Sequence, residues 1–379
     1  MRAREKQQRP LALVAREWGR IGLVGFGGPP AHIALLRELC VERRRWLSAA
    51  EFEDGVAAAN LLPGPASTQL AIWTAWRLRG AVGALVGGLA FILPGLIAIV
   101  ALAAAFLASS PPDWLRGAGA GAGAAVPAVA VAAGALLVPG SVARAASRLR
   151  WAVYALLGAV AAATLGPWLV LVLFACGAFE LLLRLRLAAL VLVWPFAAAT
   201  AGGLGSLAWT AFKVGGLSYG GGFVIVPLMQ GDAVDRFHWM SDGQFLNAVA
   251  LGQVTPGPVT HTVAAVGYAA HGVGGALLAA AVAFTPSFAF VLIGAPRFGR
   301  LVSSRGPRAF LDGAGPAAIG AILGSAIPLA IALSEAWQYA LLGFAAVALL
   351  VARRRVVETL LAAGAVGAVG VVSGWPLSG

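Results

Sequence analysis

Residues 80–108 read GAVGALVGGLAFILPGLIAIVALAAAFLA and contain no charged side chain. About 20 such residues are enough to cross the hydrocarbon core of a bilayer as a helix. The whole chain of 379 residues is similarly apolar, with 60% hydrophobic and only 11% charged residues, whereas soluble domains contain about 25% charged residues. The sequence therefore predicts an all-α polytopic membrane protein. Its continuous apolar runs exclude the short alternating strands of a transmembrane β-barrel.

The chain is strongly basic, with 27 Lys and Arg against 15 Asp and Glu and a formal net charge of +12. In a soluble protein this excess would suggest nucleic-acid binding. Here the basic residues cluster between apolar runs, so we interpret them as cytoplasmic anchors beside the lipid bilayer and expect no nucleic-acid partner. The two cysteines and four histidines have no ligand-like spacing. We therefore expect neither a metal site nor a cofactor.

The chain contains an internal repeat. The segment RIGLVGFGG begins at Arg20, and the similar segment KVGGLSYGG begins 193 residues later, at Lys213. This offset holds without a gap to the end of a Pro-Gly-Pro element at residues 63–65, which it places on a second Pro-Gly-Pro at residues 256–258. Self-similarity at a fixed offset indicates repeated structural units. The sequence therefore predicts two homologous halves.

Both halves carry the same signals for interrupted helices. The first helix of each half runs into a glycine cluster, where the backbone is free to turn. A capping box, Ser48-x-x-Glu51 in the first half and Ser241-x-x-Gln244 in the second, then starts a new helix, which the Pro-Gly-Pro element ends. We expect each half to hold two helical hairpins that enter the membrane and return, followed by two full spans.

The positions of Lys and Arg predict that the two halves have opposite orientations in the membrane. In the first half they concentrate in the N-terminal tail, at residues 43–45, at Arg77 and Arg79 and between residues 144 and 150, whereas in the second half they concentrate between residues 297 and 308. Inverted repeats with broken helices are typical of secondary transporters, whose substrate sites lie near the bilayer midplane. The predicted segments are a cytoplasmic tail (1–10), a first repeat (11–140), a connector of three apolar passes (141–203), an inverted second repeat (204–335) and C-terminal spans (336–379). This arrangement puts the N-terminus in the cytoplasm and the C-terminus outside the cell inner (plasma) membrane.

The motifs of both halves resemble those of the chromate ion transporter family in its long, two-domain form. The similarity rests on GFGGPPAHI (25–33), Glu38, Trp46-Leu47, LLPGPASTQ (61–69), YGGGFVIVPLMQ (219–230) and QVTPGPVTH (253–261). The resemblance implies a transporter that exports chromate, coupled to the proton gradient. Sulfate is the structurally similar anion that such a protein must bind or reject.

Chromate is a tetrahedral dianion, so its site needs several donors that converge on the oxygens. The N-termini of interrupted helices supply unpaired N–H groups and a positive dipole end. We therefore expect the anion at the glycine and Pro-Gly-Pro breaks, with help from neighbouring cations and polar first-turn residues. The expected substrate-binding residues are Arg20, Gly27, Gly28, His32, Pro63, Gly64, Pro65, Ser67, Thr68, Gln69, Lys213, Gly220, Gly221, Gly222, Pro256, Gly257, Pro258 and Thr260.

These residues also have plain structural interpretations. Glycines allow helices to pack closely in membranes, Arg20 is equally explained as a boundary cation, His32 as a packed core residue and Ser67 as a helix cap. Proton coupling needs a titratable group that changes its exposure, and the first half keeps acids where the second half has neutral residues. We expect Glu38 or Asp54 to carry the proton.

Three functions remain open at this point. The first is chromate export, which an inside-negative potential favours by about 2.3 kcal/mol per charge per 100 mV. The second is transport of sulfate or another oxyanion, in either direction. The third, an intramembrane enzyme, would need a nucleophile with a base or a metal cluster, and the histidines do not provide that spacing. Gly- and Ala-rich faces at 117–135 and 313–326 would allow a homodimer.

Overall fold

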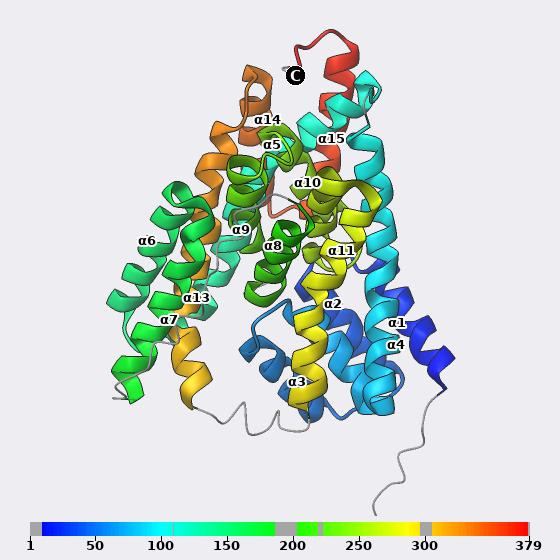
Figure 1. Ribbon diagram of the computed structural model, residues 1–379, viewed down its shortest axis with the longest axis vertical. Helices are drawn as coiled ribbons and strands as arrows, with labels where there is room; N and C mark the ends of the chain where they lie inside the picture. Colours follow the sequence, from blue (N-terminus) through cyan, green and yellow to red (C-terminus); the bar gives the residue numbers. More distant parts are fainter. Residues whose placement is uncertain (1–9, 109, 186–202, 219–222, 296–304, 378–379) are drawn as a thin grey trace, which may run out of the picture.

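The computed structural model describes residues 10–108, 110–185, 203–218, 223–295 and 305–377. All regular elements within these residues are helices (Figure 1). Four of them are long and apolar enough to cross a membrane, namely α4 (Ala66–Phe106), α5 (Asp113–Arg144), α11 (Thr262–Gly294) and α13 (Arg305–Ile331). The prediction of an all-α polytopic membrane protein is confirmed.

The helix borders repeat with the offset seen in the sequence. In the first half α1 (Leu11–Val24), the π-helix η1 (Glu38–Arg43) and α3 (Ala49–Leu61) have both borders 193 residues before those of α8 (Leu204–Leu217), η3 (Gly231–Arg236) and α10 (Asp242–Val254). Between them lie α2 (Pro29–Arg37) in the first half and α9 (Ile225–Gln230) in the second, and the 3-10 turn η4 (Val259–His261) follows α10 and leads into α11. Helices of 13 or 14 residues are about 20 Å long. They are too short to span a bilayer core of about 30 Å.

Local signals set where these helices begin and end. Ser48 and Glu51 form a reciprocal capping box at the start of α3, and Ser241 and Gln244 form the same box at the start of α10. Both predicted capping boxes are confirmed. Within α4 the helix kinks at Gly80 (φ +61°), and α11 has the matching kink at Gly272 (φ +59°). These kinks separate a short first segment from the long apolar segment that follows.

The two halves interlock through their last helices. α6 (Arg148–Thr164) and α7 (Leu169–Leu185), joined by the short turn η2 (Gly166–Trp168), pack against α13 of the second half. Conversely, α14 (Ala336–Ala346), which continues as the π-helix η6 (Val347–Val351), and α15 (Val356–Val372) pack against α5 of the first half (Figure 1). α6 and α7 correspond to the first two passes of the predicted connector. The third falls at residues 186–202, outside the described residues.

Small residues make this close packing possible. A methyl group on Gly158 of α6 or Gly320 of α13 would collide with a backbone carbonyl of the facing helix. Gly121 of α5 and Gly367 of α15 are in the same situation. The Gly- and Ala-rich faces that we considered for a homodimer are therefore occupied by helices of the same chain. The opposite orientation of the two halves stays a prediction.

Candidate functional site

Each Pro-Gly-Pro turn lies against the first helix of the opposite half. The backbone N–H of Gly257 donates a hydrogen bond to the carbonyl oxygen of Gly25 (2.9 Å). A methyl group placed on Gly64 would lie 3.2 Å from the carbonyl oxygen of Gly215 in α8. Both central glycines have positive φ angles, +119° at Gly64 and +92° at Gly257. Residues other than glycine rarely adopt such angles. The interrupted segments of the two halves are therefore in direct contact.

Buried polar side chains follow both Pro-Gly-Pro turns. Ser67, Thr68 and Gln69 lie in the first turn of α4. Thr260 and His261 of η4 and Thr262, the first residue of α11, hold the equivalent positions, and all six residues are buried. We call these six residues, together with Ser287 of α11, the polar cluster. Ser287 belongs to it because its hydroxyl oxygen would lie 3.4 Å from a methyl group on Gly64.

Several atoms of the polar cluster lack a hydrogen-bond partner among the described residues. They are Thr68 Oγ1, Gln69 Oε1, Thr260 Oγ1 and Ser287 Oγ. A buried polar group without a partner costs about 1–3 kcal/mol, and native proteins keep few of them. A concentration of such atoms beside two helix N-termini indicates a place where a polar ligand or water completes the hydrogen bonds.

The remaining polar atoms of the polar cluster hold the turns in shape. Gln69 Nε2 donates to the carbonyl oxygen of Pro63 (2.7 Å), and Thr262 Oγ1 donates to that of Val259 (2.8 Å). His32 of α2 donates from Nε2 to the carbonyl oxygen of Gly25 (2.9 Å) and accepts at Nδ1 from Ser67 (3.3 Å). His32 therefore connects the glycine break of the first half to the polar cluster, and its ring nitrogens are occupied.

The two predicted cations lie at equivalent positions and are both ion-paired. Arg20 has a side chain that is 47% exposed and lies 3.6 Å from the carboxylate of Glu17. Lys213 is only 5% exposed and pairs with the fully buried Asp232. Asp232 also accepts a hydrogen bond from Thr210 Oγ1 (2.7 Å). Both cations thus have acidic partners outside the polar cluster.

Other expected residues lie in different surroundings. Gly27 and Gly28 have positive φ (+99° and +72°) and lead into Pro29, the first residue of α2. The predicted Gly220, Gly221 and Gly222 lie outside the described residues. Glu38 and Asp54, expected to carry a proton, are exposed in this conformation.

Sequence reasoning missed three buried acids among the described residues, namely Glu17, Glu180 and Asp232. In the repeat alignment Asp232 stands opposite Leu39, and Glu17 stands opposite Thr210. The expected proton carriers are acids of the first half that stand opposite neutral residues of the second, and Asp232 is the reverse case. Its one usable signal was an acidic residue in the otherwise apolar segment that follows the second glycine cluster.

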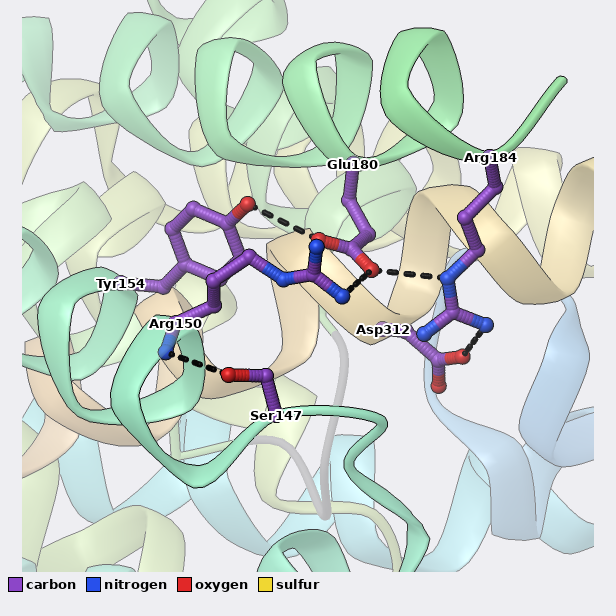
Figure 2. Close-up of polar contacts among 6 residues, drawn as sticks. All are labelled: Ser147, Arg150, Tyr154, Glu180, Arg184 and Asp312. Atoms are coloured by element: carbon purple, nitrogen blue, oxygen red, sulfur yellow. Dashed lines mark hydrogen bonds and ion pairs between the residues drawn. The ribbon is translucent and has the colours of Figure 1, made fainter. Parts of the chain in front are cut away.

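A second polar cluster connects α6 and α7 with α13 (Figure 2). Glu180, only 2% exposed, accepts hydrogen bonds from Tyr154 Oη (2.9 Å) and Arg184 Nε (2.7 Å), and Arg150 lies 3.3 Å away. Arg184 also pairs with Asp312 of α13 (2.8 Å). Two guanidinium groups thus balance two carboxylates, so this cluster is a charge-compensated link between the halves.

Comparison with known proteins gives a consistent result. The family model described as chromate transporter matches the chain twice, over residues 12–199 and 205–371. The chromate transport protein of Cupriavidus metallidurans is 35% identical over 375 residues, covering 91% of this chain and 89% of that protein. The chromate transport protein of Pseudomonas aeruginosa is 32% identical over 341 residues, covering 83% and 80%. No solved structure matches the chain. This chain, with its two halves and paired Pro-Gly-Pro turns, belongs to the chromate transporter family.

Proposed function

We propose that this protein is a secondary transporter that exports chromate across the cytoplasmic membrane, and that the anion binds at the polar cluster. The observation that carries the proposal is the group of buried, partnerless polar atoms where the two Pro-Gly-Pro turns meet the opposite halves. The names of the relatives supply the substrate. The broken helices and the duplicated arrangement are what a transporter with a midplane site requires.

The chemistry of the polar cluster suits a tetrahedral dianion. The hydroxyl groups of Thr68, Thr260 and Ser287 and an imidazole N–H of His261 can each donate to an oxyanion. The N-cap residues of α4 and η4, Pro65 and Pro258, make no side-chain capping bond. These side chains therefore do not cap the first turns of the two helices, where the helix dipole is positive and favours an anion.

The driving force follows from charge. When a dianion leaves a cell whose interior is negative, the membrane potential lowers its free energy by about 2.3 kcal/mol per charge per 100 mV. The potential alone therefore drives export, and coupling to protons changes the size of that driving force. The opposite orientation of the two halves, inferred from the positions of Lys and Arg, would present the same site to each side in turn. Hydroxyl and N–H donors do not by themselves distinguish chromate from sulfate, so sulfate is the competing substrate in every assay.

Flux measurements in proteoliposomes test the proposed site. Thr68→Val and Thr260→Val remove one hydroxyl each at nearly constant volume. Hydrogen bonds to charged groups contribute about 1.5–3 kcal/mol, so each variant should raise the KM for chromate about tenfold or more. Thr285→Val is the matched control, because Thr285 lies in the same helix and its hydroxyl donates to the carbonyl of Ala281 (2.7 Å). Unchanged KM values in both test variants would remove the polar cluster from the site.

A further inference from the structure

Lys213 and Asp232 form a buried ion pair that the proposed anion site does not use. Asp232 is 0% exposed, and its Oδ2 accepts from both Lys213 and Thr210. Its other oxygen, Oδ1, has no hydrogen-bond partner among the described residues. Removing an ion pair from water costs several kcal/mol per ion, and good geometry with satisfied hydrogen bonds is needed to recover it. A pair with one vacant carboxylate oxygen is a poor stabilising device, which favours a functional role.

The surroundings of Asp232 contain few other charges. Lys213 and Thr210 of α8 face it directly. On its own element, Asp235 and Arg236 lie farther along at exposed or half-buried positions. The turn η2 approaches through Gly166 and contributes no titratable side chain among its described residues. The packed helix α10 begins with the exposed Asp242. Within the described part of the chain, Lys213 is therefore the charge that faces Asp232.

The residue types also suit proton exchange. A carboxylate accepts a proton on either oxygen, and Oδ1 of Asp232 has no hydrogen-bond partner among the described residues. Asp232 lies in the π-helix η3. Turns of π-helix are rare in proteins overall, but those that occur are often found at functional sites. The helix that carries Lys213 also carries Gly215, whose carbonyl faces the Pro-Gly-Pro turn at Gly64. A change at the pair can therefore be transmitted to the anion site through one helix.

We propose that Asp232 carries the proton that is coupled to anion transport, an inference that rests on the proposed function. In a conformation that opens the pair to water, a proton from water adds to Oδ1 and converts the carboxylate to the neutral acid. Lys213 keeps its ammonium charge, so the pair changes from neutral to +1 and favours a bound anion. Loss of the proton to water restores the neutral pair and favours release. Proton and anion binding then strengthen each other equally. They leave the cell together, and the outward proton offsets part of the free energy that the membrane potential contributes to export of the dianion.

Proton uptake on binding tests this directly in the wild-type protein. The purified full chain in weakly buffered detergent solution receives chromate at a pH where chromate is fully ionised, and a pH indicator records protons taken up. We expect close to one proton per bound chromate and an apparent affinity that changes by up to about tenfold per pH unit, the limit for one proton. Chromate binding without proton uptake would overturn the inference. Absence of chromate binding would instead refute the proposed function.

Variants locate the proton. Asp232→Asn should bind chromate without proton uptake and with a nearly flat pH dependence, while chromate counterflow in proteoliposomes continues. Lys213→Arg keeps the charge and should keep proton uptake. Glu358→Gln, an exposed acid, is the matched control and should behave as wild type. Normal proton uptake in Asp232→Asn would contradict the inference. Loss of proton uptake in Glu38→Gln or Asp54→Asn, with Asp232 intact, would show that another residue carries the proton.

Discussion

Arg20 and Lys213 hold the same position in two copies of one fold, yet their surroundings differ. In the first half the carboxylate of Glu17 lies 2.6 Å from the guanidinium of Arg44, 2.8 Å from that of Arg43 and 3.6 Å from that of Arg20. The side chains of these three arginines are 41–47% exposed. In the second half the acid is Asp232, which lies in η3 and not in the first helix. It pairs inside the protein with one lysine, Lys213. The comparison teaches that duplication preserved the backbone while the charges diverged. One half has a buried carboxylate surrounded by three partly exposed arginines, and the other has a closed pair of one lysine and one acid.

Loss of the buried Lys213 should destabilise the protein more than any other change considered below. Lys213→Ala leaves Asp232 as an uncompensated buried charge, which costs about 3–5 kcal/mol of stability. Arg20→Ala breaks a half-exposed pair and should cost about 1 kcal/mol or less. Thermal unfolding of both variants in the same detergent measures the contrast. Equal losses would show that the two pairs are not different in kind.

A second prediction concerns replacement of both charges of the buried pair by apolar residues, as at the corresponding acid position of the first half. Leu39 occupies the position that corresponds to Asp232. The double variant Lys213→Met with Asp232→Leu removes both charges, and apolar replacements of a buried pair are often neutral or stabilising. We expect it to recover most of the stability lost in Lys213→Ala. It should also lose the pH dependence of chromate binding, as measured by titration at several pH values. A double variant as unstable as Lys213→Ala would contradict this reasoning.

The link between the halves gives a third, intermediate effect. Asp312→Asn weakens the partly exposed pair with Arg184 (2.8 Å) but leaves Arg184 bound to Glu180. We expect a loss of about 1 kcal/mol, in the range of exposed pairs, and chromate affinity unchanged. Asp113→Asn, whose pair with Arg116 is exposed, serves as control. A tenfold change in chromate affinity would indicate that this cluster takes part in binding.

The smallest effect comes from the two capping boxes. Glu51 lies in the first turn of α3, outside the four candidate spans, and hydrogen bonds from Ser48 together with the Arg77 guanidinium lower its pKa. A lowered pKa adds stability above the unfolded value, and this contribution is lost as the pH falls through the folded pKa. Glu51→Gln, which copies Gln244 of the second half, should remove this small acid-dependent loss below about pH 4.5. Unfolding curves that stay equally acid-sensitive would disprove the assignment.

The sequence was informative where structure depends on near neighbours. Ser48 and Ser241 cap their helices through residues three positions away, and Gly64 and Gly257 supply backbone angles that follow from residue type. What remained hidden depends on which distant segments meet. Lys213 pairs with Asp232, and the residue that corresponds to Asp232 in the first half is the apolar Leu39. The Gly- and Ala-rich faces are used within the chain because α6 and α7 reach across to α13, which no local pattern reports.

We propose that the anion sits where the Pro-Gly-Pro turn of each half meets the opposite half. Diffraction from crystals grown with chromate, recorded on both sides of the chromium absorption edge, locates the metal atom of the substrate without assumptions about the protein. The proposed site predicts an anomalous peak within hydrogen-bonding reach of Thr68 and Thr260. A peak beside Arg150 and Arg184, with none at the polar cluster, would contradict it.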